Sequence, residues 1–215
     1  MQPSTVLAFD TSAAHCAAAL LLPDGRCLHR FEEMAKGQAE ALMPMLEGLL
    51  NEAGLAWKDV SSIAVGTGPG NFTGVRISVA AARGLALALG VPAVGVTTLE
   101  ALAYGLPRPV LVLEDARRGD VYVQEFTSVG PKPAALMALT DVTLEPGMRH
   151  LGSAAEALED RALEKPLKPL FPLAEAIARI GAIRARTPQP RPAPFYLRGA
   201  DAAPPSEAPP VILDA

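Results

Sequence analysis

A glycine-rich stretch is the part of this sequence whose residue types and spacing most suggest chemistry. Residues 66–77 read GTGPGNFTGVRI and directly follow the apolar run SIAV. A glycine-rich turn between a strand and a helix often cradles a phosphate group, because backbone N–H groups at the helix start point at the anion. A Walker A loop also needs a lysine, and residues 59–131 contain none. A dinucleotide fingerprint needs a sixth-position glycine, where this chain has Asn71.

Two interpretations of the stretch remain open. In the first, Gly68 and Gly70 form a tight turn, Asn71 caps the next helix, and the exposed N–H groups still bind an anion. The candidate anion or nucleotide contacts are then Asp10, Thr11, Ser12, Gly68 and Gly70. In the second interpretation, the stretch only turns a strand sharply into a helix.

Side chains for catalysis or metal binding are few and scattered. The three histidines are His15, His29 and His150, and the two cysteines are Cys16 and Cys27. The chain therefore has no His-x-x-x-His pair, no Cys-x-x-Cys pair and no recognisable nucleophilic triad. We predict no catalytic residue, no metal ligand set, and free thiols in a reducing compartment.

Two aspartates at the ends of predicted strands are further candidates. Asp10 and Asp115 lie 105 positions apart, and a turn follows each of them. Together they could hold a magnesium ion in a cleft between two lobes. Alternatively, each carboxylate caps the turn after its own strand.

Hydrophobic periodicity gives the elements that position these residues. The first half reads as β-β-β-α-β-α-β, with predicted elements at 5–9, 15–22, 26–31, 38–53, 62–65, 72–89 and 91–96. A second strand–aspartate–turn–strand pattern over 110–126 is a weak sign of a duplicated unit. Helical periodicity returns over 173–183, and prolines crowd the chain from residue 187 onward.

The helix predicted over 72–89 is more apolar than one sheet requires. Its only charged residues are Arg76 and Arg83, which are seven positions apart and so lie on one face. A helix that covers a sheet needs an apolar stripe only about 100° wide. The surplus indicates either a further covering element of this chain or a partner protein, with alanines and Gly84 permitting close contact.

Bulk composition bounds the partners. The chain has 215 residues, 50% of them hydrophobic, and a formal net charge of −4, which argues against nucleic-acid binding by general charge attraction. The N-terminal residues do not read as a secretory signal, and no apolar run reaches the roughly 20 residues of a membrane span, so we expect a cytoplasmic protein. A local basic segment, 176–200, has five arginines and no acidic residue, and is either a solvated face or a dock for RNA or an acidic partner.

The sequence resembles the bacterial TsaB family, also called YeaZ. The stretches that carry the resemblance are VLAFDTS (6–12), GTGPGNFTGVRI (66–77), GVTTLEALA (95–103), EDARRGDVYVQEF (114–126) and PFYLR (194–198). The resemblance implies an α/β fold of two lobes, of the actin-like ATPase (ASKHA) class, with RNase H-like units in tandem. We therefore expect an N-terminal lobe over 1–103, a reduced second lobe over 104–190 and a proline-rich tail over 191–215.

The resemblance also implies a function. TsaB-like proteins are non-catalytic dimerisation subunits that bind a related catalytic subunit, TsaD, with an ATPase, TsaE. The complex places a threonylcarbamoyl group on N6 of adenosine 37 in tRNAs that read codons starting with A. Contact with tRNA is then indirect, and the chain has no cofactor of its own, although ATP with magnesium could lie at an interface with its partners. TsaD-like proteins carry a His-x-x-x-His metal pair where this chain begins its first helix at Gln38, without histidine.

The family pairs two helices with those of its partner, or of a second copy when the partner is absent. The expected interface, toward which the glycine turn aims the second helix, comprises Leu42, Met45, Leu49, Phe72, Val75, Arg76, Val79, Ala80, Arg83 and Leu87. The alternative function is a stand-alone ATP-binding kinase or ATPase that holds a nucleotide between Asp10 and the turn at Gly68 and Gly70. A peptidase is disfavoured because the chain lacks a histidine pair and a triad.

Overall fold

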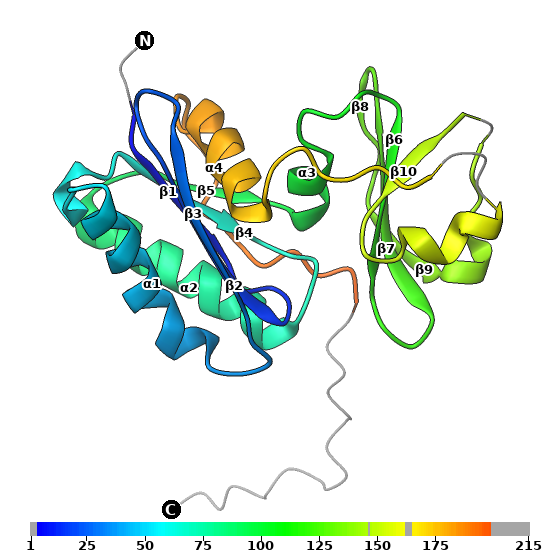
Figure 1. Ribbon diagram of the computed structural model, residues 1–215, viewed down its shortest axis with the longest axis horizontal. Helices are drawn as coiled ribbons and strands as arrows, with labels where there is room; N and C mark the ends of the chain where they lie inside the picture. Colours follow the sequence, from blue (N-terminus) through cyan, green and yellow to red (C-terminus); the bar gives the residue numbers. More distant parts are fainter. Residues whose placement is uncertain (1–3, 146, 162–164, 199–215) are drawn as a thin grey trace, which may run out of the picture.

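The first half of the chain is built around a five-stranded mixed sheet (Figure 1). The computed structural model describes residues 4–145, 147–161 and 165–198. The strands, in the sheet order β3-β2-β1-β4-β5, are β1 (Val6–Asp10), β2 (His15–Leu21), β3 (Cys27–Glu33), β4 (Ser62–Gly66) and β5 (Ala93–Val96). β1 pairs antiparallel with β2 and parallel with β4. The element order predicted for this half is confirmed.

Helices cover both faces of this sheet. They are α1 (Gln38–Glu52) and α2 (Phe72–Leu89) on one face and α4 (Leu173–Arg184) on the other (Figure 1). The alternation of side chains along β1 explains this sandwich, because Leu7 and Phe9 pack with α1 and α2, whereas Val6 and Ala8 pack with α4. The strands β1, β2 and β4 are therefore buried on both faces, whereas the edge strand β3 is largely exposed.

A second sheet repeats part of this arrangement. Its strands are β6 (Val110–Asp115), β7 (Asp120–Thr127), β8 (Gly130–Pro131), β9 (Ala135–Ala138) and β10 (Arg149–Leu151). β6 pairs antiparallel with β7 and parallel with β10, as β1 pairs with β2 and β4. Asp10 and Asp115 consequently end equivalent strands, as the sequence pattern predicts.

Short helices complete the described chain. They are α3 (Thr98–Ala103) and the 3₁₀ turns η1 (Trp57–Asp59), η2 (Leu139–Asp141) and η3 (Ala155–Arg161). α3 lies between the two sheets (Figure 1) and packs against Val110 and Val112 of β6, while Leu111 and Leu113 face η3. Sequence reasoning missed α3, β8, β9 and β10, because each is short and none has a long periodic pattern.

The expected lobe boundaries need a correction at the C-terminal side. Residues 104–190 were expected to form the second lobe, but α4 packs on β1, β2 and β4 of the first sheet. Gly181 permits this approach, since a Cβ there would come 2.5 Å from the Cβ of Ala64. Of the predicted tail, residues 191–198 are described and pack on the protein, while 199–215 lie outside the described residues.

Candidate functional site

The glycine turn is filled by the protein's own backbone. The end of β1 and the two residues after it, 10–12, lie directly against the turn. A Cβ at Gly66 would overlap the carboxylate of Asp10, one at Gly70 would overlap the carbonyl oxygen of Ser12, and one at Gly74 would overlap the carbonyl oxygen of Thr11. These glycines therefore allow residues 10–12, at the end of β1, to pack closely on the segment that joins β4 to α2.

The start of α2 is also already capped. The side-chain oxygen of Asn71 accepts hydrogen bonds from the N–H groups of Thr73 (2.9 Å) and Gly74 (3.2 Å). The N–H of Asn71 itself donates to the carbonyl oxygen of Ser12 at 2.6 Å. Three N–H groups at this helix end, those of Asn71, Thr73 and Gly74, are thus satisfied within the chain.

The anion or nucleotide contacts expected at this turn therefore need correction. Asp10 and Thr11 are 0% exposed and Ser12 is 2% exposed, and Gly68 is buried as well. The structure brings these residues together with Gly70, but they fill the space that a phosphate would occupy. Of the two interpretations of the glycine stretch, the sharp turn from strand to helix is the one that fits.

Asp10 and Asp115 each cap the turn that follows their own strand. One oxygen of Asp10 accepts from the Ser12 N–H (2.9 Å) and lies 2.8 Å from Nε2 of His15, and one oxygen of Asp115 accepts from the Arg117 N–H (2.8 Å). The other Asp10 oxygen is buried against Gly66 without a hydrogen-bond partner. Among the described residues, no three His, Cys, Asp or Glu side chains gather as a metal would require. The magnesium interpretation does not fit this geometry, and the capping interpretation does.

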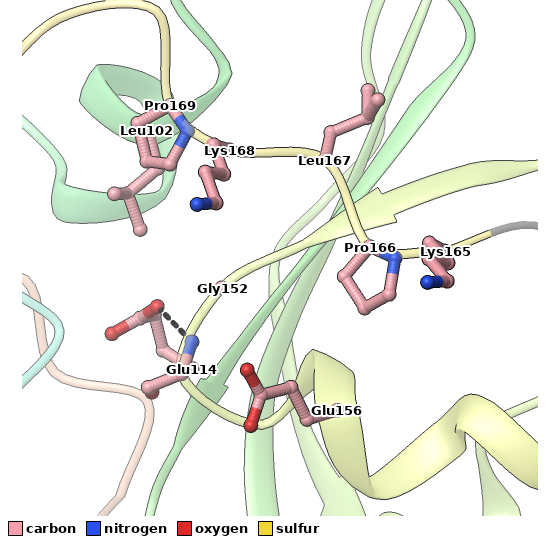
Figure 2. Close-up of a pocket in the computed structure, with 10 residues that line it drawn as sticks. Leu102, Glu114, Gly152, Glu156, Lys165, Pro166, Leu167, Lys168 and Pro169 are labelled. Carbon is pink, nitrogen blue, oxygen red and sulfur yellow. Dashed lines mark hydrogen bonds between the residues drawn. The ribbon is translucent and has the colours of Figure 1, made fainter.

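A separate hollow lies between α3 and the ends of β6 and β10. Figure 2 shows this cavity of about 440 Å³, bounded by Glu114, Glu156, Lys165 and Lys168 among other residues. The Glu114 carboxylate accepts the N–H of Ser153 at 2.8 Å, and burial raises the pKa of Glu114 above its usual range. Sequence reasoning did not find this hollow, because its residues come from four separate segments.

Half of the expected interface residues lie inside the core. Leu42, Met45 and Leu49 of α1 are at most 8% exposed and pack in the core with the first sheet, and Val75 and Val79 of α2 are at most 2% exposed. The expectation that these five side chains contact a partner is therefore wrong. They form the inner faces of the two helices, with the spacing that burial on a sheet requires.

Four of the remaining expected residues, Phe72, Arg76, Ala80 and Leu87, are exposed along one side of α2. The fifth, Arg83, is half-buried and donates to the carbonyl oxygen of Pro192, whereas Gly84, which was not among the expected residues, is exposed. We call Phe72, Arg76, Ala80, Gly84 and Leu87 the α2 stripe; their spacing of three or four residues places them on one side of the helix. Phe72 is 43% exposed and Leu87 is 82% exposed, so the stripe presents apolar surface to solvent. Met43, 38% exposed on the neighbouring α1, is a further exposed apolar residue that sequence reasoning missed.

The apolar character of α2 also gives it the composition of a membrane span. It is the one described helix that is long and apolar enough to cross a bilayer, and a third of the span (33%) is buried inside the protein. This corrects the expectation that no run is long enough. Packing of its inner side on β4 accounts for part of the apolar content, and the α2 stripe accounts for the rest.

Most of the predicted basic segment is bound within the chain. Arg179 pairs with Glu175 on α4, Arg184 pairs with Glu100, and Arg198 pairs with Asp120. On α2, Arg83 donates to the carbonyl oxygen of Pro192. The segment is therefore not a continuous free basic surface.

The two thiols are free, as predicted from their positions. Cys16 lies opposite Glu32 and Cys27 lies opposite Leu21, so the sulfurs belong to different rows of the hairpin. The pairing of Cys27 with Leu21 follows from a turn at Asp24 that is longer than two residues. Burial raises the pKa of both thiols to about 11.

Comparison with known proteins places the chain in a family. Residues 32–172 match the family model described as TsaD, tRNA N6-adenosine threonylcarbamoyltransferase. The tRNA threonylcarbamoyladenosine biosynthesis protein TsaB of Escherichia coli is 39% identical over 56% of this chain and 54% of its own length. The chain thus spans about half the length of the curated TsaB relatives that it matches.

Solved structures agree with this assignment. YeaZ from Pseudomonas aeruginosa superposes with a TM-score of 0.70 at 32% identity, over 90% of this chain and 100% of that one. Component A of (R)-2-hydroxyglutaryl-CoA dehydratase from Acidaminococcus fermentans shares the fold alone. It superposes with a TM-score of 0.57 at 9% identity, over 86% of this chain and 100% of that one. The fold is therefore the two-lobed actin-like one, and the chain belongs to the TsaB family, also called YeaZ.

Proposed function

We propose that this protein is a non-catalytic dimerisation subunit in the synthesis of threonylcarbamoyladenosine in tRNA, and that it binds a TsaD-like catalytic subunit. The observation that carries the proposal is the α2 stripe, an exposed apolar line on a helix whose other side is already buried. The names of the E. coli and Bacillus subtilis relatives supply the pathway. Exposed contiguous apolar surface on a helix commonly marks a protein-protein contact.

The charges next to the stripe favour a helical partner of related shape. α1 carries the acidic residues Glu40, Glu47 and Glu52 and no basic residue, whereas α2 carries Arg76 and Arg83 and no acidic residue. The two helices pack side by side (Figure 1), so one acidic and one basic helix share a surface. The TsaD family model matches this chain over residues 32–172, which include both helices. A related subunit can therefore pair helix against helix about a pseudo-two-fold axis.

The filled glycine turn supports a role without catalysis. A nucleotide at this turn would have to displace the backbone of Ser12 and the cap at Asn71. We therefore propose that the chain has no cofactor of its own, and that ATP with magnesium acts where the partners, including a TsaE-like ATPase, contribute residues.

The chain's setting and partners belong to the same proposal. Because its net charge is −4, the chain contacts tRNA only indirectly. It works in the cytoplasm. When the catalytic subunit is absent, the exposed stripe is expected to pair with a second copy.

Complex formation tests this proposal. The chain is mixed with the TsaD-like subunit of the same organism, and the mass of the complex is measured by light scattering after size exclusion. We expect a one-to-one complex, and we expect Ala80→Arg to prevent it, because Ala80 is exposed at the middle of the stripe.

Val129→Arg is the matched control. It adds the same charge at a residue that is 97% exposed in the second lobe, and it should leave the complex intact. A wild-type chain that forms no complex at any salt concentration would overturn the proposal, and so would an Ala80→Arg chain that binds as tightly as the wild type.

The stand-alone ATPase is the alternative, and calorimetry separates it. Titration of Mg-ATP into the isolated chain should give no binding heat at millimolar nucleotide. Tight binding would show that the loop after β1 can leave the glycine turn, and would favour the enzyme.

A further inference from the structure

The segment 192–198 is a strap that lies along α2 and the glycine turn. Arg83 donates from Nε to the carbonyl oxygen of Pro192 at 2.7 Å. The N–H of Phe195 donates to the carbonyl oxygen of Thr67, just after β4, at 2.8 Å. The strap therefore has fixed backbone contacts on the first lobe, although it is neither helix nor strand.

The far end of the strap is attached to the second lobe. Leu197 packs against the core beneath α3 and β6, and Arg198 forms an ion pair with Asp120 at 2.6 Å. Because both ends are held, Tyr196 between them has a fixed position beside α2.

Tyr196 extends the α2 stripe at the N-terminal end of the helix. Its ring stacks on Phe72 with centroids 5.2 Å apart and an interplanar angle of 28°. The guanidinium carbon of Arg76 lies 3.7 Å from the centre of the Phe72 ring, and Nε of Arg76 donates to the Tyr196 hydroxyl at 3.0 Å. Tyr196 is still 41% exposed and Phe72 is 43% exposed, so this cluster of two rings and one cation faces solvent.

The cluster fixes one guanidinium without using all of its donors. An arginine has five N–H groups, and only Nε of Arg76 is bonded among the described residues. The terminal nitrogens form the planar fork that binds a carboxylate through two parallel hydrogen bonds. Since both rings already hold the side chain, little further rotamer freedom is lost when an acceptor binds.

We infer that Phe72, Arg76 and Tyr196 form the polar end of the partner surface, and that the catalytic subunit places a carboxylate against Arg76. This inference rests on the proposed function and adds a residue outside the two helices, Tyr196, and a chemical requirement on the partner. Aromatic rings and arginine are the side chains most enriched among the residues that dominate interface energies.

A second copy of this chain fits the cluster less well than the catalytic subunit does. If α2 pairs antiparallel with itself about Ala80, Arg76 faces Gly84 and Leu87 of the other α2, which carries no carboxylate, so only a glutamate of the neighbouring α1 could supply one. A guanidinium buried there without a partner would weaken the pair. The catalytic subunit is therefore the occupant, and the homodimer is the contrasting case in the test.

Calorimetry on full-length chains with the TsaD-like subunit tests the inference. Because loss of a charge-assisted bidentate contact costs at least about 1.4 kcal/mol, which is tenfold in affinity, Arg76→Ala should weaken the complex at least tenfold. Tyr196→Ala should weaken it by a similar factor. Tyr196→Phe keeps the stacked ring and should weaken it by about fivefold or less, since only one neutral hydrogen bond is lost. Arg191→Ala is the matched control, because Arg191 is an exposed arginine just before the strap.

The outcomes separate this inference from the proposed function. If the wild type binds and the Arg76→Ala and Tyr196→Ala chains, shown folded by circular dichroism, bind equally well, the inference is wrong and the proposed function stands. If the wild type does not bind, the proposed function fails and the inference fails with it. If Arg76→Ala weakens only the homodimer, a second copy is the occupant and the inference is overturned. The expected loss should also shrink at high salt, because an ion pair at a rim is screened.

Discussion

Two glycines of α2 should respond in opposite directions to the same substitution. Gly74 lies in the first turn, where a Cβ would overlap the carbonyl oxygen of Thr11 and lie 3.0 Å from its carbonyl carbon. At Gly84, nearly three turns further along the same helix, a Cβ would have nothing within 4 Å. Alanine therefore meets a rigid backbone at one position and open space at the other.

The magnitudes follow from packing and helix propensity. Replacing a helical glycine with alanine stabilises a protein by at most about 1 kcal/mol. Overpacking against an atom that cannot rotate away costs about 1–3 kcal/mol or more. The hydroxyl of Thr11 also donates to the carbonyl oxygen of Gly74 at 2.7 Å, so a shift of the helix would strain this bond as well. We expect Gly74→Ala to lower the free energy of unfolding by about 2 kcal/mol and Gly84→Ala to raise it by up to about 1 kcal/mol.

Urea unfolding of the isolated chain, followed by circular dichroism, measures both changes. For a protein of this size, about 2 kcal/mol corresponds to a fall in Tm of about 4–8 °C. Equal stabilisation by both alanines would refute the close packing of the loop after β1 on α2. It would also reopen the glycine turn as a site for an anion.

Three further predictions concern the inner face of α2, a buried carboxyl group and the thiols. Val79→Arg should unfold the chain, because Val79 is 2% exposed, whereas Ala80→Arg should leave its circular dichroism and Tm nearly unchanged; similar losses of Tm would contradict the assignment of faces. Burial raises the pKa of Glu114, so its ionised form destabilises the fold at neutral pH, and Glu114→Gln should be more stable than wild type at pH 7. In urea unfolding this stability difference should disappear as the pH falls, because Glu114 then binds a proton. A stability difference that does not change with pH would exclude this cause. The pKa values of Cys16 and Cys27 are raised to about 11, so less of each thiol is ionised to the reactive thiolate. Both should react with a disulfide reagent at pH 8 about two orders of magnitude more slowly than in the unfolded chain. Equal rates in the folded and unfolded chains would show that the thiols are exposed.

The first lobe follows from local sequence patterns. Apolar runs bounded by turn residues predict β1 and β4, and Leu42, Leu46 and Leu49 mark the inner side of α1. Asn71 was expected to cap α2, and it does. These features depend on residues close together in the chain, which is why a single sequence suffices to find them.

The two sides of α2 are harder to separate from sequence, because both are apolar. Val75, Val79, Ala82 and Ala86 are buried at helical spacing, but Ala80 and Leu87 on the opposite side have similar hydropathy. The positions of Arg76 and Arg83 carried the missing signal, since two charges on one side of an apolar helix mark the outward side.

The partners in long-range contacts could not be read from the sequence. The filling of the glycine turn depends on residues 10–12 meeting residues 66–74, and α4 returns to the first sheet across the whole second lobe. The spacing of Gly66, Gly70 and Gly74 was nevertheless a usable sign, because glycines four residues apart at a strand-to-helix turn indicate another backbone close by. The contact of Tyr196 with Phe72 left no such sign.

The most direct test of the accessory role is the transfer of labelled threonine-derived carbamoyl groups to tRNA in a purified system. The assay compares the TsaD-like subunit, the ATPase and the donor-forming enzyme with and without this chain, and with its Ala80→Arg variant. The account predicts no transfer by the chain alone, transfer by the full set, and loss of transfer when the chain is omitted or carries Ala80→Arg. Transfer by the chain alone, or an unchanged rate without it, would contradict the account.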